Sequence, residues 1–343
     1  MIKEDKRILL HMQDAVSEKI YKYRIAYGNG SQEAIGKIIE TAQPGGVRLI
    51  EFMERHRSHL YIFGAGILGK EFLRTWMWKY SFRGLIDNDE KKQGGSIEGI
   101  PVIGLKDITE TDKKEAAVII VNKFSSNEIA LQLRQEKFSG ENIFDFASYY
   151  LRLNREQYFD LEAFRKDSRE RFADCGALDG KTSLYFYEWY RDSADKIWLF
   201  EPDKYSVEKC RQNMRGIGFH NYEIFENAVY SSKTELHFDS AGNGMSSISA
   251  KGDTIVNAIS LDEAIGEESP SFIKMDIEGA ELEALKGAKN IIQKYAPKLA
   301  VCVYHKPEDM EEIPQLLLEY NPNYRFYLRH YSLTMNETVL YAL

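Results

Sequence analysis

The residues with the clearest capacity for chemistry lie in the stretch 174–182 (DCGALDGKT), between a short apolar run and a helical pattern. Gly176 and Gly180 lack a side chain, so the backbone around them can take positive φ angles and approach a ligand closely. The free N–H groups at the start of the following helix favour an anionic group such as a carboxylate. Asp174 and Asp179 add polar side chains to the same turn. Many α/β proteins contain such a turn, so it predicts a ligand site without identifying the ligand.

Polar residues also end the next two expected strands. Glu201 stands 27 residues after Asp174 (201 − 174), and a carboxylate at that point suits the two hydroxyls of a ribose. The alternative is a cap for the following helix, a role that Asp203 would fill better. Asn227 and Ala228 end the third strand, where they could meet an adenine edge. The alternative there is a turn built around an asparagine.

A further apolar strand ends in the alternating charges Lys274, Asp276 and Glu278. Alternation along a strand places all three on one face, and burying three charges is costly unless they serve a site. Ligands of open α/β sheets bind at this edge. His305 ends the strand after it, and an unperturbed histidine titrates near neutrality, so it suits proton transfer. The alternatives are a helix start with salt bridges and a structural histidine.

A second glycine-rich turn, Gly64-Ala65-Gly66-Ile67-Leu68-Gly69, follows another expected strand. Gly64, Gly66 and Gly69 satisfy the G-x-G-x-x-G spacing, and Asp87 at the end of the next strand fits a ribose partner. The surrounding segment resembles the nucleotide-binding N-terminal domain of bacterial amino-sugar acetyltransferases. The resemblance implies a nucleotide, a nucleotide-sugar or a dinucleotide as ligand. The alternative is a Rossmann-like scaffold with an empty site.

Parallel sheets would bring these residues to common edges. From residue 59 onward, apolar runs alternate with helical stretches, which indicates an α/β fold. In the C-terminal half the expected strands are 171–176, 196–202, 221–229, 235–240, 271–277, 298–304, 324–332 and 338–343, and the expected helices are 182–191, 204–214, 261–267, 280–295 and 309–320. We expect a helical segment at 1–57, a smaller Rossmann-like domain of the nucleotide-binding type at 58–148, a helical connector at 149–168 and a second α/β domain at 169–343. The helices of 1–57 would form a small bundle or an arm that makes a homodimer.

The composition is ordinary for a globular chain. A formal net charge of −8 argues against a general attraction to nucleic acid or anionic lipid. Cys175, Cys210 and Cys302 have no metal-ligand spacing and are too few for a disulfide framework, which fits a reducing cytoplasm. No apolar run approaches the roughly 20 residues of a membrane span. We therefore expect a cytoplasmic protein whose partner is a small molecule or glycan.

The motifs of the C-terminal half together resemble the FkbM family of methyltransferases. The resemblance covers about residues 170–343, and its most specific piece is KMDIEGAE at 274–281. It implies the class I methyltransferase fold, a Rossmann-like seven-stranded sheet whose last strand is antiparallel, with S-adenosylmethionine as cofactor. Members commonly carry asparagine where this chain has Leu178. One polar contact to the cofactor is therefore missing or is supplied by Asp179.

The resemblance also implies roles for individual residues. It assigns the methionine half of the cofactor to Asp174, Gly176, Asp179 and Gly180, the ribose to Glu201, the adenine to Asn227 and Ala228, and the region beside the methyl group and the acceptor to Asp276 and Glu278. Apart from the resemblance, Tyr304 and His330 are further candidates for acceptor binding, with Glu278. The family is mostly associated with O-methylation of sugars and of other secondary-metabolite hydroxyls. The acceptor varies too widely within it to be transferred to this chain.

The sequence therefore predicts methyl transfer from S-adenosylmethionine to a hydroxyl of a sugar or other small molecule. Alignment of donor and acceptor would give most of the acceleration, and Asp276 or His305 acting as general base would add ~10²–10⁴-fold. Asp276 and Glu278 could ligate a metal, but no His/Asp cluster at ligand spacing demands one, so no metal is invoked. One alternative is a dehydrogenase or nucleotide-sugar enzyme that works through Gly64–Gly69. Another is a binding protein with a non-catalytic methyltransferase-like domain, which only Leu178 supports.

Overall fold

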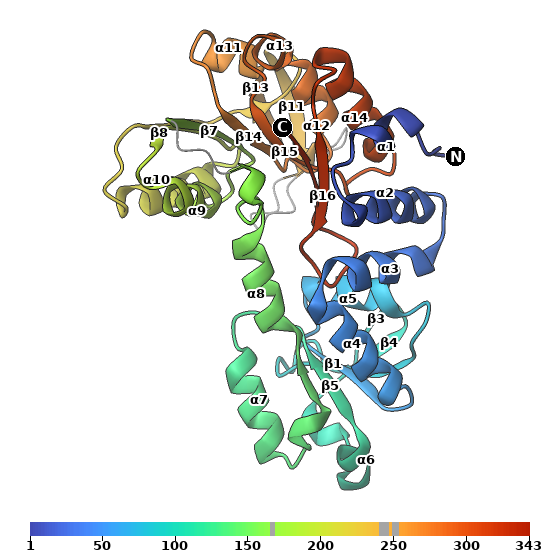
Figure 1. Ribbon diagram of the computed structural model, residues 1–343. Coiled ribbons are helices and arrows are strands. Elements are labelled where there is room, and N and C mark those ends of the chain that lie inside the picture. Colours follow the sequence, from blue (N-terminus) through green and yellow to red (C-terminus); the bar gives the residue numbers. More distant parts are fainter. Residues whose placement is uncertain (165–168, 240–246, 249–253) are drawn as a thin grey trace. The chain divides into compact units, whose positions relative to one another are not determined.

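The structure is a computed structural model that describes residues 1–164, 169–239, 247–248 and 254–343 (Figure 1). Its contacts group the chain into two compact units. Unit 1 comprises Met1–Tyr21, Gln157–Arg329 and Thr338–Leu343, and unit 2 comprises Lys22–Glu156 and His330–Glu337. The end of the expected connector (165–168) and the last residue of the expected strand 235–240 lie outside the described residues. The domain ranges drawn from the sequence pattern stay a prediction.

Unit 1 is built on a seven-stranded sheet with the order β16-β17-β15-β14-β7-β8-β9. Its strands are β7 Glu170–Cys175, β8 Ala194–Phe200, β9 Tyr222–Phe225, β14 Phe272–Met275, β15 Lys298–Cys302, β16 Phe326–His330 and β17 Thr338–Ala342. The pairs β8–β9, β7–β8, β14–β7 and β14–β15 are parallel, whereas β17 runs antiparallel to β15. The predicted seven-stranded sheet with an antiparallel last strand is therefore confirmed.

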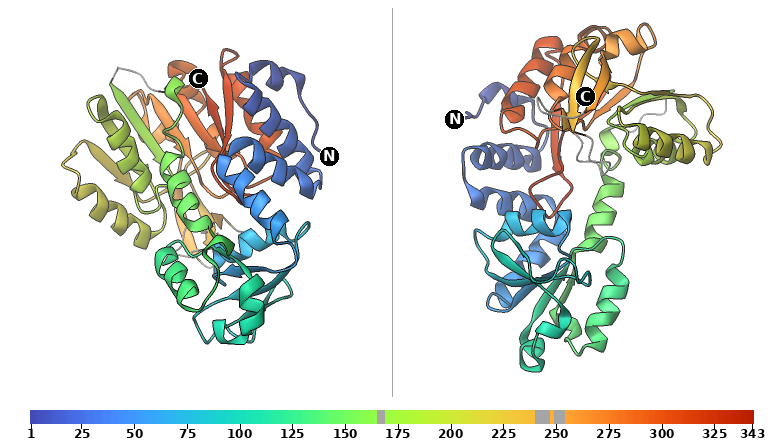
Figure 2. Two further views of the ribbon diagram at one scale, coloured as in Figure 1. Left: turned by 60° about the horizontal axis from the view of Figure 1, so that its bottom comes forward. Right: turned by 180° about the vertical axis from the view of Figure 1, so that it is seen from behind.

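The central strands of this sheet are buried almost throughout, as expected for parallel strands covered on both faces. All residues of β14 and β15 are buried, and so are five of the six residues of β7. The helices of this region are α9 Lys181–Tyr190, α10 Lys204–Arg215, α11 Leu261–Ile265, α12 Glu281–Lys286, α13 Lys289–Tyr295 and α14 Asp309–Tyr320. Helix α9 packs against β7 and β8, and α10 packs against α9 and β9 (Figure 2).

A second, smaller sheet of unit 1 was not expected. It has the order β10-β13-β11-β12 and contains β10 Ala228–Val229, β11 Thr234–Asp239, β12 Ser247–Ile248 and β13 Thr254–Ile259. The expected strand 221–229 is wrong as one strand, since β9 pairs with β8 whereas β10 pairs with β13. Strand β13, TIVNAI, was not among the expected strands, although the sequence pair Gly252-Asp253 directly before it is a turn signal.

The expected single helix 280–295 is also wrong, because it is two helices, α12 and α13. Gly287 separates them, and a Cβ on this residue would lie 2.2 Å from the carbonyl oxygen of Tyr230. The carbonyl oxygen of Gly287 accepts a hydrogen bond from the Asp262 N–H, and the Asp262 carboxylate accepts from the N–H groups of Asn290 and Ile291 at the start of α13. Contacts distant in sequence therefore break the helix.

The N-terminal segment of unit 1 contains α1 Lys6–His11 and the first part of α2 Ala15–Gly28. It lies along β16, the edge strand of the seven-stranded sheet. Met12 forms a parallel bridge with Phe326, and the Gln13 N–H donates to the Phe326 carbonyl over 3.0 Å. This segment therefore satisfies backbone groups that an edge strand would otherwise expose.

Unit 2 has a six-stranded sheet in the order β3-β4-β2-β1-β5-β6. Its elements are α3 Gln32–Ala42, α4 Pro44–Arg55, β1 Leu60–Phe63, α5 Ile67–Trp76, β2 Phe82–Ile86, β3 Ser96–Ile97, β4 Ile100–Ile103, α6 Glu110–Glu115, β5 Ala117–Ile120, α7 Ser126–Gln135, β6 Ile143–Asp145 and α8 Phe146–Glu156. All pairs are parallel except β3–β4. This arrangement agrees with the expected Rossmann-like sheet.

Among the described residues, no helix combines the length and apolar character that a membrane span needs.

Candidate functional site

The glycine-rich turn of unit 1 connects β7 to α9. Gly176 and Gly180 have φ angles of +79° and +77°, which favour glycine. A Cβ on Gly176 would lie 2.0 Å from the carbonyl oxygen of Asp276, so this glycine lets the ends of β7 and β14 approach each other. Gly180 is the N-cap of α9. The turn therefore leads directly from the strand ends to the start of a helix.

Asp174 is fully buried at the end of β7, and its carboxylate faces a buried cation. The Lys274 ammonium lies 3.1 Å from Asp174 Oδ1, and the Ser183 hydroxyl donates to Oδ2 over 2.8 Å. Lys274 also donates to the carbonyl oxygen of Gly176 over 2.7 Å. Burial opposes the charge of Lys274, but Asp174 and Asp276 raise its pKa above the ordinary value. This ion pair consequently holds the glycine-rich turn in place.

Glu201 joins the same turn to the end of β8. Its Oε2 accepts a hydrogen bond from the Leu178 N–H, and its Oε1 accepts one from the Asp203 N–H, both over 2.9 Å. The side chain is buried, and burial raises the pKa of Glu201 to about 7 in spite of these two bonds. Asp203, whose side chain accepts from the Ser206 N–H, is the N-cap of α10. The alternative role of Glu201 as that cap is therefore wrong.

The remaining predicted cofactor residues lie along this edge. Asp179 accepts from the Lys181 N–H over 3.1 Å and forms an ion pair with the Lys181 ammonium. Asn227 is half-buried in the connection between β9 and β10, and Ala228 is buried at the start of β10. Leu178 has a φ angle of +51° and a 41% exposed side chain. No polar side chain takes the place of asparagine at this position.

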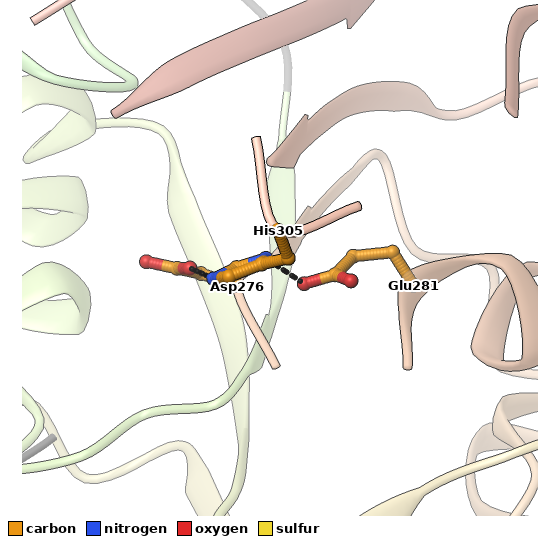
Figure 3. Close-up of side chains that lie close together, drawn as sticks. All are labelled: Asp276, Glu281 and His305. Atoms are coloured by element: carbon orange, nitrogen blue, oxygen red, sulfur yellow. Dashed lines mark ion pairs between the residues drawn. The ribbon is translucent and has the colours of Figure 1, made fainter. Parts of the chain in front are cut away.

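Asp276 follows β14 and belongs to a polar cluster with His305 and Glu281 (Figure 3). Its Oδ2 accepts from the Tyr158 hydroxyl over 3.1 Å, and its Oδ1 accepts from the Tyr304 hydroxyl over 3.3 Å. The nearest nitrogen of His305 lies 3.7 Å from Oδ1. Burial would raise the pKa of Asp276, but the positive charges of Lys274 and His305 lower it. Asp276 is therefore ionised at neutral pH.

His305 lies between Asp276 and the buried Glu281, which begins α12 (Figure 3). Its Nδ1 is 3.0 Å from Glu281 Oε1, and its Nε2 is 3.5 Å from Glu278 Oε2. Burial lowers the pKa of His305, but the carboxylates of Glu281, Asp276 and Glu278 outweigh it and raise the pKa to about 9. Strand alternation does not explain this grouping, since β14 ends at Met275 and the following turn places Asp276 and Glu278.

His330, the third candidate for acceptor binding, belongs to unit 2, whereas the other site residues of the C-terminal half belong to unit 1. It is fully buried, and its Nε2 lies 3.1 Å from the Thr334 carbonyl oxygen. Burial and the nearby charge of Arg24 lower its pKa well below the ordinary value. These contacts explain His330 as a structural residue, and its acceptor role stays a prediction.

The glycine-rich turn of unit 2 has the expected strand–turn–helix form between β1 and α5. Gly64 has a φ angle of +122°, and a Cβ on Gly69 would lie 1.9 Å from the Gly64 carbonyl oxygen. Gly66 has no neighbour within 4 Å of a Cβ. Asp87 accepts hydrogen bonds from the Ala65 N–H and the Lys92 ammonium. Gly64 and Gly69 therefore serve the fold, whereas the packing does not require glycine at position 66.

Sequence reasoning missed three residues of the site. Lys274 was recognised as a charge but not as the partner of Asp174. Glu281 was read as part of a motif, and Tyr158 as part of a connecting helix. Only KMDIEGAE could have drawn attention to Glu281, and no signal in the sequence identified Tyr158, whose hydroxyl reaches Asp276 from a distant segment.

Comparison with known proteins extends these observations. Residues 174–326 match the family described as the methyltransferase FkbM domain. The hexuronic acid methyltransferase AglP of Haloferax volcanii is 34% identical over 130 residues, which are 36% of this chain and 53% of AglP. This chain thus spans about half the length of that curated relative.

A solved structure gives a likeness over nearly the whole chain. The methyltransferase FkbM from Methylobacillus flagellatus KT superimposes with a TM-score of 0.53 and 18% identity, covering 93% of this chain and 100% of that one. At this identity the likeness concerns the fold, which is that of the class I methyltransferases. Together, the sheet order, the polar edge and the match over residues 174–326 identify the C-terminal region as a methyltransferase FkbM domain.

Proposed function

We propose that the protein transfers a methyl group from S-adenosylmethionine to an oxygen of a sugar or another small molecule. The observation that carries this proposal is the convergence at one sheet edge of the Gly176–Gly180 turn, Glu201 and Asp276. The turn and Glu201 are joined by a hydrogen bond, and Gly176 touches the backbone of Asp276. Ligands of open α/β sheets bind at this edge.

The cofactor would lie across the ends of β14, β7 and β8. Glu201 uses one lone pair of each carboxylate oxygen for a backbone N–H, and each oxygen has another for a ribose hydroxyl. The start of α9 and Asp179 would face the methionine half, whose carboxylate a helix N-terminus favours. Asn227 and Ala228 would meet the adenine. Asp276, which follows β14, would lie beside the sulfonium.

In the reaction, an acceptor oxygen attacks the methyl carbon in line with the carbon–sulfur bond. The new oxygen–carbon bond forms as that bond breaks, and the sulfonium becomes a neutral thioether. The acceptor proton passes to Asp276, or to His305 above about pH 9, where the imidazole is neutral. Holding the two reactants in line supplies most of the acceleration, so positioning by Tyr304 and Glu278 would matter as much as the base.

A sugar acid is the first acceptor to test, because the relative named above is a hexuronic acid methyltransferase. Transfer of radiolabelled methyl from S-adenosylmethionine would be measured with hexuronic acids, neutral hexoses and their nucleotide conjugates. Labelling of a sugar by the wild type, lost in Asp276→Asn, supports the proposal. Failure to label any of these sugars, by folded wild-type protein that binds S-adenosylmethionine, would overturn the sugar assignment.

Calorimetry tests cofactor binding separately from the acceptor. S-adenosylmethionine and S-adenosylhomocysteine should both bind the wild-type protein. Glu201→Gln should weaken S-adenosylhomocysteine by ~10–100-fold, because the amide loses an acceptor for a backbone N–H and for the ribose. Glu208→Gln, an exposed acid on α10, is the matched control and should leave binding unchanged. Absence of heat with folded wild-type protein would contradict the proposal.

A second candidate function is nucleotide or nucleotide-sugar binding by unit 2, which the open space at Gly66 favours. Gly66 has extended backbone angles, φ −107° and ψ −163°, which valine also adopts. Gly66→Val should therefore keep the fold and block a ligand. If UDP-sugars raise the melting temperature of the wild type but not of Gly66→Val, the turn binds them. Equal shifts in both proteins would exclude this turn as the site.

A further inference from the structure

Three side chains from separate segments come together in unit 1, and no single sequence motif contains all three. Asp276 follows β14, Glu281 begins α12 and His305 follows β15 (Figure 3). One ligand atom from each residue lies within 4.8 Å of the ligand atoms of the other two. Sequence spacing could not reveal the group, because the fold alone brings His305 to the two acids.

Two of these side chains are buried without adequate hydrogen bonds. The side chain of His305 is 9% exposed and that of Glu281 is 0% exposed. Within the described part of the chain, neither ring nitrogen of His305 nor Oε2 of Glu281 has a hydrogen-bond partner, although the His305 and Glu281 atoms approach to 3.0 Å. Each buried polar atom left unsatisfied destabilises the folded protein. Their common orientation toward one small space points to a ligand there.

The charges around this space are predominantly negative. Three carboxylates, those of Asp276, Glu278 and Glu281, lie within 3.7 Å of His305. The neighbouring ammonium of Lys274 pairs with Asp174, and that of Lys306 donates to the Gly279 carbonyl oxygen. A cation of charge +2 would compensate the excess more completely than one imidazolium proton does. Buried charges of one sign are otherwise costly.

We propose that Asp276, Glu281 and His305 form a binding site for one divalent metal ion of the manganese or zinc type. A mixed set of imidazole and carboxylate ligands suits these metals. Metal–ligand bonds of about 2.1 Å place ligand atoms about 3 Å apart at right angles. The His305–Glu281 distance of 3.0 Å already meets this spacing, and the His305–Asp276 distance of 3.7 Å needs a small side-chain rotation.

Glu278 stands beside this site and adds a further carboxylate 3.5 Å from His305. It holds a φ angle of +55° and precedes Gly279 at +93°. Non-glycine residues in this region of backbone space are strained, and such strain gathers at functional sites. A metal held here would bind the acceptor oxygen and make it more acidic. This consequence rests on the proposed methyl transfer, whereas metal binding itself does not.

The test uses the full chain after removal of metal by a chelator. Manganese(II) is titrated into the protein without cofactor, and free manganese is followed by electron paramagnetic resonance. We expect one bound ion per chain. Asp276→Asn, Glu281→Gln and His305→Gln should each weaken binding at least ~10-fold. Glu283→Gln, a neighbouring acid on α12 that pairs with Lys286, is the matched control and should bind as the wild type does.

Further measurements make the result decisive. Circular dichroism and melting temperature establish that each variant is folded. Adding zinc to the manganese-loaded protein and measuring how much manganese stays bound shows which metal the site prefers. Titration of the chelated wild type with S-adenosylhomocysteine tests cofactor binding independently. If the folded wild type binds S-adenosylhomocysteine but takes up neither manganese nor zinc when either is titrated in, the metal site is overturned and the proposed methyl transfer stays intact. Equal manganese binding by the three variants and the wild type also overturns it.

Discussion

At the scale of single residues, Leu178 holds a backbone conformation that its side chain disfavours. Its φ angle is +51°, in the left-handed region where asparagine is several-fold enriched. The strain costs roughly 1 kcal/mol, and the 41% exposed side chain gives little burial in return. Leu178→Asn should therefore stabilise unit 1 by about 0.5–1 kcal/mol and tighten S-adenosylhomocysteine binding by ~3–10-fold. Chemical denaturation and calorimetry measure the two effects.

Leu178→Gly separates the two causes of this gain. Glycine removes the backbone strain but supplies no amide group. If the glycine and asparagine variants bind S-adenosylhomocysteine equally well, the polar contact inferred for this position does not exist. Retention of binding by the wild type, with leucine in place, would also remove the support that Leu178 gives to a non-catalytic methyltransferase-like domain.

The buried acid Glu201 makes stability depend on pH. Its pKa is raised to about 7 from the ordinary 4.5, so between these values the folded protein keeps a proton that the unfolded chain has released. Stability from Glu201 is therefore full below the unfolded pKa and is lost as pH rises toward 7. Relative to Glu201→Gln, the wild type should lose on the order of 2–3 kcal/mol between about pH 5 and about pH 7.5. Urea unfolding of both proteins checks this, and a constant difference would contradict it.

Residue types alone predicted much of the polar edge, since Asp174 lies near the end of β7, and Glu201 and Asp276 directly follow β8 and β14. Their partners could not be predicted in the same way. Tyr158 comes from a segment before the first strand of the sheet, and Glu281 turns back toward His305 from the start of the next helix. Such contacts depend on how chain segments return to one another, which local patterns do not encode.

At the scale of elements, the amino ends and the carboxyl ends of the strands in the seven-stranded sheet have different roles. A buried ion pair lies at the starts of β7 and β15, away from the polar edge: the Lys298 ammonium is 2.8 Å from Glu170 Oε1 and also donates to the Tyr190 hydroxyl. Lys298→Met leaves Glu170 buried without its cation and should destabilise unit 1 by about 3–5 kcal/mol. Lys294→Met, which breaks an exposed pair with Glu267, should cost about 0–1 kcal/mol.

Thermal and urea unfolding of these two variants would test the difference. Adding Glu170→Leu to Lys298→Met should recover most of the loss, because it removes the isolated buried charge. If Lys298→Met unfolds like the Lys294→Met control, the buried pair does not support the sheet. Since neither residue lies at the polar edge, binding of S-adenosylhomocysteine should persist in the folded fraction.

The most predictable elements were those with a clear local pattern, either a continuous apolar run or a helical period. The buried strands β14 and β15 and the helix α9 appear where the apolar runs and the glycine-rich turn place them. Prediction was wrong where tertiary contacts override local preference, as at Gly287, whose backbone meets Tyr230. It was wrong again at 221–229, because β9 and β10 join different sheets after only two residues, Glu226 and Asn227.

At the scale of the whole molecule, each unit is assembled from segments distant in sequence. Met1–Tyr21 groups with the methyltransferase-type sheet, and His330–Glu337, between β16 and β17, groups with unit 2. Within unit 2, the Trp76 indole donates to the Leu333 carbonyl, and the Met335 N–H donates to the Thr75 hydroxyl. A period in the sequence indicates which segments are strands or helices but not which unit receives them. The predicted helical segment at 1–57 illustrates this limit.

The N-terminal segment gives this arrangement a testable consequence. It was predicted to form a bundle or a dimer arm, yet in unit 1 the Gln13 N–H donates to the Phe326 carbonyl and the Ser17 hydroxyl accepts from the Leu328 N–H. Deleting residues 1–13 would expose the β16 edge, and an exposed edge strand pairs with other chains. We therefore expect the deletion variant to self-associate at concentrations where the full chain does not, as measured by light scattering after gel filtration.

Gln13→Ala, which keeps the backbone N–H, is the control and should behave as the full chain does. A full chain that is dimeric and a deletion variant that is monomeric would instead establish the dimer arm and refute the edge-covering role, because loss of the segment would then remove an interface.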